Sequence, residues 1–212
     1  MCSKIIVSSA QMGPISILDT KKKCVKRMME MMKEAKAQGS RFVVFPELAL
    51  TTFFPRWLIE NQSELDKWFE TEMPSKDTYP LFELAKNYEI SFCLGYAEKI
   101  YENGEFKYFN TSILVNSKGI ICGKYRKIHL PGYDKPQKNR KNQHLEKKYF
   151  KKGNLGFPVF DMFKTKIGML ICNDRRWTEA WRILALKNAE IVCLGYNTPD
   201  DHSGYNEIDK LA

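Results

Sequence analysis

The feature that most constrains the fold of this chain is the alternation of short apolar segments with segments of helical periodicity. Runs of strand length occupy residues 4–11, 41–46, 90–96, 109–115, 119–124, 166–172 and 191–196. Apolar side chains recur at helical spacing in residues 21–38, 79–88 and 179–188. Strands that alternate with helices indicate an α/β fold with mixed sheets. Because 212 residues suffice for one hydrophobic core, we expect a single domain over residues 1–212.

Three chemically reactive residues lie where predicted strands end. Cys172 closes the apolar run 166–172, Glu47 follows an earlier strand, and Lys127 follows a third. Open α/β sheets bind ligands beyond the carboxyl ends of their strands. We therefore expect a thiol, a carboxylate and an ammonium group to meet on one side of a sheet.

These three groups form a set that is suited to nucleophilic catalysis. A free thiol has a pKa of roughly 8.5, so near neutral pH it needs a base to become a strong nucleophile. Glu47 can accept the proton, and Lys127 can stabilise the negative charge that follows attack. A Cys–His protease is less favoured, because no predicted strand ends at a histidine; the histidines are His129, His144 and His202.

Each of the three residues also has a simpler structural interpretation. Cys172 alone fits a buried structural thiol, and Glu47 fits a capping residue of a turn. Lys127 fits a solvated charge, since Lys124 and Arg126 lie beside it. The residues taken alone leave both interpretations open.

Three sequence blocks resemble the motifs of the nitrilase, or carbon–nitrogen hydrolase, superfamily. They are Phe45-Pro46-Glu47, residues 123–130 with Lys127, and Ile171-Cys172-Asn173-Asp174. The resemblance implies a four-layer α-β-β-α sandwich. It also implies that Glu47 is the general base, that Lys127 stabilises the oxyanion and that Cys172 is the nucleophile. Glu146 matches an auxiliary glutamate of the superfamily, although by itself it fits an ordinary charged partner on a helix.

Longer blocks resemble the branch of the superfamily that hydrolyses N-carbamoyl-D-amino acids, the D-carbamoylases. These blocks are residues 47–57, 109–114, 143–150, 172–177 and 195–199. The resemblance implies hydrolysis to the D-amino acid, carbon dioxide and ammonia through a thioester on Cys172, with no cofactor and no metal ion. The alternative is another nitrilase-type amidase that acts on a different linear amide or ureido acid.

The same resemblance implies a set of substrate contacts. Arg175 and Arg176 match arginines that bind the substrate carboxylate, a role that suits the forked geometry of a guanidinium group. The backbone N–H near Asn173 matches an oxyanion donor, and His144 and Asn197 match pocket positions. A surface location at the start of a helix is the structural alternative for the two arginines.

The resemblance also concerns the end of the chain. Superfamily members continue well beyond the position that matches Pro199, so we expect a truncated member whose sandwich is incomplete at its C-terminal end. The resemblance implies a homodimer or homotetramer for the full-length protein. A catalytically silent fragment, with a binding or remnant role, is the alternative from a different class of function.

Composition limits the partners and the compartment. The net charge is +9, and much of the basic excess lies in residues 135–152, which we expect to form a solvated loop and helix face. No nucleic-acid motif accompanies these charges, and no apolar run is long enough to span a membrane. The six cysteines include no CxxC pair, which fits a reducing compartment, and no metal-ligand cluster appears. We therefore expect a cytoplasmic enzyme that acts on a small-molecule substrate.

Overall fold

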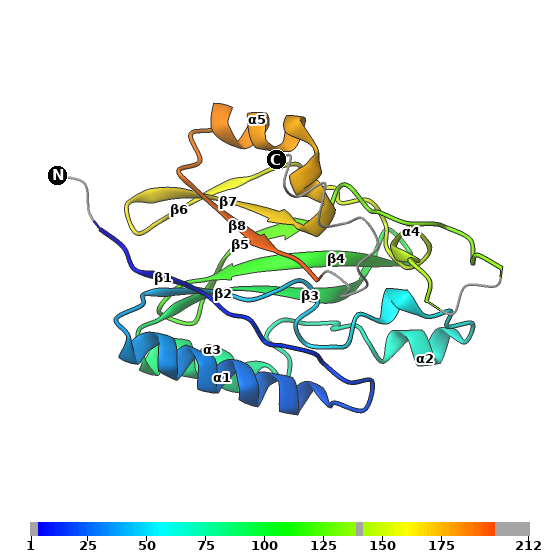
Figure 1. The fold of residues 1–212 in the computed structure, drawn as a ribbon, viewed down its shortest axis with the longest axis horizontal. Helices are drawn as coiled ribbons and strands as arrows, with labels where there is room; N and C mark the ends of the chain where they lie inside the picture. The colour runs from blue at the N-terminus through cyan, green and yellow to red at the C-terminus, as the bar shows by residue number, and fades with distance from the viewer. Residues whose placement is uncertain (1–3, 139–141, 198–212) are drawn as a thin grey trace.

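The computed structural model describes residues 4–138 and 142–197 (Figure 1). Cys2, His202, Pro199 and the chain end at Ala212 lie outside the described residues. The strands are β1 (Val7–Ser9), β2 (Phe42–Val44), β3 (Ser91–Glu102), β4 (Glu105–Val115), β5 (Ile121–Arg126), β6 (Val159–Met162), β7 (Thr165–Ile171) and β8 (Ile191–Gly195). The helices are α1 (Lys21–Ala37), α2 (Gln62–Asp66), α3 (Tyr79–Asn87), α4 (Glu146–Tyr149) and α5 (Thr178–Leu186), with short 3₁₀ turns η1 (Phe54–Arg56) and η2 (Cys172–Arg176).

The strands form two separate sheets. The first sheet has the order β1-β2-β3-β4-β5, and the second has the order β6-β7-β8. β1, β2 and β3 pair in parallel, whereas β4 pairs antiparallel with both β3 and β5. β2 and β5 consequently end at the same edge of the first sheet. In the second sheet β7 pairs in parallel with β8.

The two sheets pack face to face, and helices cover their outer faces. Figure 1 shows α1 and α3 against the first sheet and α5 against the second. The core between the sheets contains Phe42, Cys93 and Leu114 from the first sheet and Met169 and Cys193 from the second, all nearly inaccessible to solvent. The expected four-layer α-β-β-α arrangement is therefore confirmed.

The sequence explains the longest helix, α1. Thr20 caps its first turn by accepting a hydrogen bond from the Lys23 backbone N–H at 3.2 Å. The helix buries one face against the first sheet, and the buried residues are Cys24, Val25, Met28, Met32 and Ala35. Gly39 follows the helix with a φ of +83°, a conformation that suits glycine. The methionines therefore pack in a hydrophobic core.

The turn between β3 and β4 agrees with its sequence. Asn103 and Gly104 have φ values of 55° and 84°, so both central residues adopt the left-handed conformation of a two-residue hairpin. The strand β6 was not predicted from the sequence. It has four residues and is followed by Phe163 and Lys164, which also have positive φ.

In the described part of the basic segment 135–152, lysine side chains are exposed but several other side chains are not. Lys147, Lys148, Lys151 and Lys152 are exposed, as expected of a solvated face. Leu145, Glu146, Tyr149 and Phe150 of the same segment are buried. Among the described residues, no helix is long and apolar enough to cross a membrane.

Candidate active site

Glu47 lies in a tightly enclosed loop that follows β2. The next residue, Leu48, has a φ of 49°, which is unusual for a side chain other than glycine. Two glycines leave room for this loop: a Cβ on Gly95 would lie 2.7 Å from the Pro46 carbonyl oxygen, and one on Gly195 would lie 3.0 Å from the Glu47 nitrogen. Strands of both sheets therefore fix the position of the Glu47 backbone.

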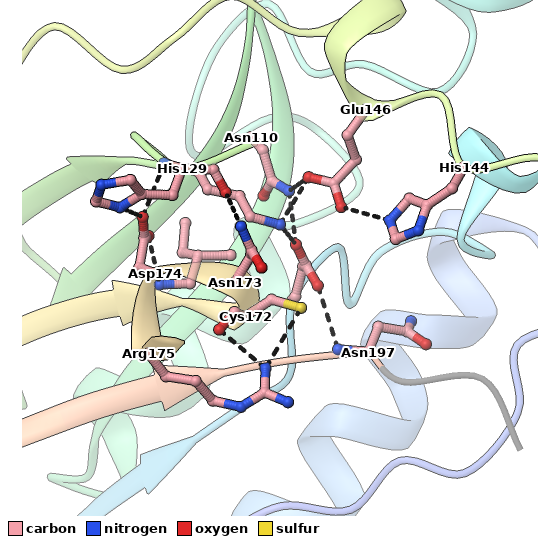
Figure 2. Close-up of polar contacts among 12 residues, drawn as sticks. Asn110, His129, His144, Glu146, Cys172, Asn173, Asp174, Arg175 and Asn197 are labelled. Atoms are coloured by element: carbon pink, nitrogen blue, oxygen red, sulfur yellow. Dashed lines mark hydrogen bonds and ion pairs between the residues drawn. The ribbon is translucent and has the colours of Figure 1, made fainter. Parts of the chain in front are cut away.

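Lys127 forms ion pairs with two carboxylates. Its Nζ lies 2.7 Å from Glu47 Oε1 and 2.6 Å from Glu146 Oε2, and all three side chains are fully buried. Asn110 connects the same carboxylates, because its Nδ2 donates to Glu47 Oε1 at 2.8 Å and to Glu146 Oε2 at 3.4 Å. Figure 2 shows Asn110 and Glu146 in this network. Lys127 and Glu146 are thus not solvated charges, and the simpler structural interpretations of both residues are wrong.

Cys172 does not end a strand, as the sequence predicted, but begins the 3₁₀ turn η2. Strand β7 ends at Ile171, and Cys172 has a φ of 46°, outside the strand conformation. In Figure 2 the sulfur points toward the network that contains Asn110 and Glu146. The predicted meeting of thiol, carboxylate and ammonium is therefore found, but with a correction. Glu47 and Lys127 follow strands of one sheet, whereas Cys172 follows a strand of the other.

Burial and mutual charge shift the proton affinities of these groups. Burial raises the pKa of Glu47 above its ordinary value; Lys127 opposes this shift, and the charge of Glu146 adds to it. Burial also disfavours ionisation of Glu146, but Lys127 and His144 together outweigh it and lower the pKa of that carboxyl. Burial, together with the negative charge of Glu47, raises the pKa of the Cys172 thiol to about 12. Near neutral pH the thiol is consequently protonated, and its proton must be removed before or during any attack.

The residues of η2 that follow Cys172 lie close to it. The Arg175 Nη1 donates to the Cys172 carbonyl oxygen at 2.9 Å and lies 3.7 Å from its sulfur. The guanidinium carbon of Arg175 lies 5.2 Å from the centre of the Tyr196 ring. Arg176 is half-buried in the same turn. The Asn173 side chain donates to the His129 carbonyl oxygen at 3.0 Å, and its backbone N–H remains a candidate oxyanion donor.

His144 and Asn197 both contact the carboxylates. His144 Nε2 lies 3.5 Å from Glu146 Oε1. The backbone N–H of Asn197 donates to Glu47 Oε2 at 3.2 Å, as Figure 2 shows. The sequence reasoning missed Asn110, although an asparagine within the apolar strand 109–115 was a signal that a buried polar partner lies nearby.

A cavity of about 860 Å³ opens beside Glu47. Its lining includes Glu47, Phe53, Tyr196 and Asn197, together with the segment 9–15 after β1. The cavity is large enough for a small molecule and lies against the Glu47 loop, whereas the Glu47 carboxylate itself is closed off from solvent. Within the described ranges, no group of three or more histidine, cysteine or acidic residues is placed to bind a metal ion.

Comparisons with known proteins agree with this fold. The family model described as Carbon-nitrogen hydrolase matches residues 6–206. A protein named Nitrilase from Pyrococcus abyssi is 34% identical over 186 residues, which cover 88% of this chain and 62% of that protein. An N-carbamoylputrescine amidase from Arabidopsis thaliana is 28% identical, with 89% of this chain and 57% of that protein covered.

A solved structure is similar over nearly the whole chain. The carbon-nitrogen hydrolase from Helicobacter pylori G27 superposes with a TM-score of 0.73 at 27% identity, covering 93% of this chain and 63% of that one. The chain thus spans about 57–62% of the length of the two curated relatives.

Proposed function

Since this chain belongs to the carbon–nitrogen hydrolase family, we propose that it hydrolyses N-carbamoyl-D-amino acids to the D-amino acid, carbon dioxide and ammonia. The observation that carries the proposal is the fully buried ion-pair network of Lys127 with Glu47 and Glu146, toward which the Cys172 sulfur points. The network supplies a base and a cation, and Cys172 beside it supplies a nucleophile. The name of the N-carbamoylputrescine amidase supports an N-carbamoyl substrate.

The proposed reaction begins with proton transfer. Glu47 accepts the proton of the Cys172 thiol, and the resulting thiolate attacks the ureido carbonyl carbon. The raised pKa of Glu47 makes this carboxylate a stronger base than an exposed glutamate. Lys127 and the backbone N–H near Asn173 stabilise the oxyanion of the tetrahedral intermediate.

The second half of the reaction releases the products. The intermediate collapses with departure of ammonia, which takes its proton from Glu47, and a carbamoyl thioester remains on Cys172. Glu47 then activates a water molecule, which hydrolyses the thioester and regenerates the thiol. The carbamate released from the enzyme separates into carbon dioxide and the D-amino acid.

Arginines beside the nucleophile support a substrate that carries a free carboxylate. Arg175 contacts Cys172 directly, and Arg176 lies in the same turn. A guanidinium group binds a carboxylate with two parallel hydrogen bonds, so the α-carboxylate of the substrate fits here. His144 and Asn197 would complete the pocket around the ureido group through their contacts with the two glutamates.

Ammonia release from matched substrates tests the proposal. We expect release from N-carbamoyl-D-alanine, little from the L enantiomer, and none from either with Cys172→Ala. Arg176→Ala should lower kcat/KM for the free acid by about 30-fold or more, and far less for the corresponding amide. The reason is that only the acid has a carboxylate charge that loses its guanidinium partner in the variant. Equal losses on both substrates would show that Arg176 is structural, and equal release from the D and L enantiomers would favour another linear amide or ureido compound as substrate. Ammonia release by Cys172→Ala at the wild-type rate would refute the mechanism.

A further inference from the structure

We propose that Asp174 is a positioning residue that fixes the Cys172 turn against the Lys127 segment, a role that rests on the proposed function of these two residues. Neither the sequence motifs nor the comparisons assign a role to this carboxylate. It is fully buried, two residues after Cys172. It carries out no chemical step in the proposed mechanism and acts only through the groups that it binds.

The Asp174 carboxylate accepts hydrogen bonds from three residues. Its Oδ2 accepts from the Tyr125 hydroxyl at 2.7 Å and from the Ile171 backbone N–H at 3.0 Å. Its Oδ1 accepts from the His129 backbone N–H at 2.9 Å and lies 2.8 Å from His129 Nδ1. Figure 2 shows the contact between Asp174 and His129. The carboxylate is therefore well compensated for its burial, as buried acceptors must be.

These contacts connect the segments that carry the ammonium and the thiol. Tyr125 and His129 lie two residues before and two residues after Lys127, on the first sheet and the segment that follows it. Ile171 ends β7 of the second sheet and directly precedes Cys172. The Asp174 carboxylate thus connects, through hydrogen bonds, the segment around Lys127 on the first sheet with the end of β7 on the second sheet.

The backbone at Cys172 shows why such a tie matters. Its φ of 46° is costly for a residue with a side chain and persists only where the surroundings impose it. The Asp174 carboxylate accepts a hydrogen bond from the backbone N–H of Ile171, the residue before Cys172. This hydrogen bond closes the turn that contains Cys172. The Asn173 side chain adds a second tie to the His129 carbonyl oxygen.

His129 is itself immobilised by packing, so it can serve as a fixed point. Its ring stacks on Trp177, with centroids 4.7 Å apart and planes inclined by 10°, and it also stacks on Phe157. A displacement of about 1 Å in a reacting group can lower a rate by about 100-fold. Loss of the Asp174 contacts should therefore uncouple the thiol from its base without unfolding the sheets.

A double-mutant cycle on the reactivity of Cys172 tests the proposal without any substrate. The rate of Cys172 alkylation by iodoacetamide is measured near neutral pH by peptide mass spectrometry for the wild type, Glu47→Gln, Asp174→Asn and the double variant. We expect Glu47→Gln to slow alkylation by about tenfold or more in the wild type, because the base is lost. In the Asp174→Asn background the same substitution should change the rate by less than about twofold, because the thiol no longer lies against Glu47. An equal effect in both backgrounds would show that Asp174 only stabilises the fold.

Matched variants cover the remaining outcomes. Glu70→Gln removes another buried carboxylate, which is paired with Lys21, and should leave the effect of Glu47→Gln undiminished. If Asp174→Asn does not fold, Tyr125→Phe replaces it in the cycle, since this change removes one hydrogen bond and keeps the buried carboxylate.

If Glu47→Gln does not change the alkylation rate of Cys172 even in the otherwise wild-type protein, the assignment of Glu47 as the base is wrong, and the positioning role of Asp174 is not yet contradicted. In that case the role of Asp174 is tested by comparing the pH midpoint of Cys172 alkylation between the wild type and Asp174→Asn. A midpoint that falls in Asp174→Asn supports the positioning role, and an unchanged midpoint refutes it.

Discussion

Lys127 has one positive charge and two carboxylate partners, and this imbalance governs how the three side chains share protons. Glu47 and Glu146 both lie within 2.7 Å of its Nζ, and solvent reaches none of the three. Lys127 and His144 together lower the pKa of Glu146, whereas burial and the charge of Glu146 keep the pKa of Glu47 raised. The two glutamates thereby differ in proton affinity, which suits the proposed roles of Glu146 as a fixed anion and of Glu47 as the proton acceptor.

The raised pKa of Glu47 predicts the acid limb of the pH profile. In the proposed mechanism Glu47 must be ionised to accept the thiol proton, so activity should be lost as the pH falls through its pKa, which lies above the ordinary value of 4.5. Removal of the Glu146 charge should lower the pKa of Glu47. We therefore expect the acid limb of kcat/KM to lie above pH 4.5 and to move to lower pH in Glu146→Gln.

Ammonia release measured across pH checks this expectation. Glu70→Gln is the control, because it changes a buried carboxylate whose partner is Lys21 rather than Lys127, and its limb should coincide with that of the wild type. A limb that stays in place in Glu146→Gln would contradict the assigned coupling between the two glutamates.

At the scale of single elements, the loop after β2 depends on glycines in β3 and β8. A Cβ on Gly95 would lie 2.9 Å from Glu47 Cα as well as 2.7 Å from the Pro46 carbonyl oxygen. Both contacts are with the backbone, which cannot rotate away as a flexible side chain can. Gly95→Ala should therefore displace Glu47 and lower kcat by about 100-fold.

Gly123→Ala provides the matched control for this prediction. It also adds a methyl group to a strand of the first sheet, but there the Cβ would meet the Phe160 ring at 2.8 Å rather than the backbone of a site residue. We expect a lower melting temperature with a much smaller loss of kcat. Similar kcat values for the two variants would show that Gly95 does not position Glu47.

The elements that the sequence predicted well are those whose signal is local. Residues 109–115 and 119–124 form an antiparallel pair, because their apolar runs and the intervening turn suffice to specify it. β6 was missed because its four residues gain stability from their neighbours in the second sheet.

The assignment of strands to sheets was likewise not predictable from local pattern. An apolar run shows that a strand is buried but not which sheet it joins. The sequence therefore could not show that Cys172 follows a strand of one sheet while Glu47 and Lys127 follow strands of the other. The positive φ of Cys172 had no local signal either, since glycine is absent there.

At the scale of the whole molecule, the candidate site depends on the packing of one sheet against the other. Met169 is fully buried in the core between the sheets, where its sulfur lies 3.8 Å from Cys93 Sγ. Met28 is equally buried, but it lies between α1 and the first sheet. Truncation of either methionine to alanine should lower the free energy of unfolding by about 2–5 kcal/mol.

The two truncations should differ in their effect on activity. Met169→Ala lets the sheets shift relative to each other and should lower kcat even far below its melting temperature, whereas Met28→Ala should retain kcat there. Thermal unfolding and ammonia release on the same samples check this difference. Equal kcat values would show that the site tolerates movement between the sheets.

Complete burial of Lys127, Glu47 and Glu146 should shield the proposed proton transfer from dissolved ions. Proton transfer from Cys172 to Glu47 relocates one negative charge within a region that counterions do not enter. The diffusional encounter between substrate and protein differs in this respect. A chain of net charge +9 attracts an anionic substrate at long range, and salt screens this attraction beyond a Debye length of about 8 Å at physiological ionic strength. Added salt should therefore raise KM for a substrate acid and leave kcat unchanged. The dependence of the two constants on ionic strength would then distinguish substrate binding from the chemical step.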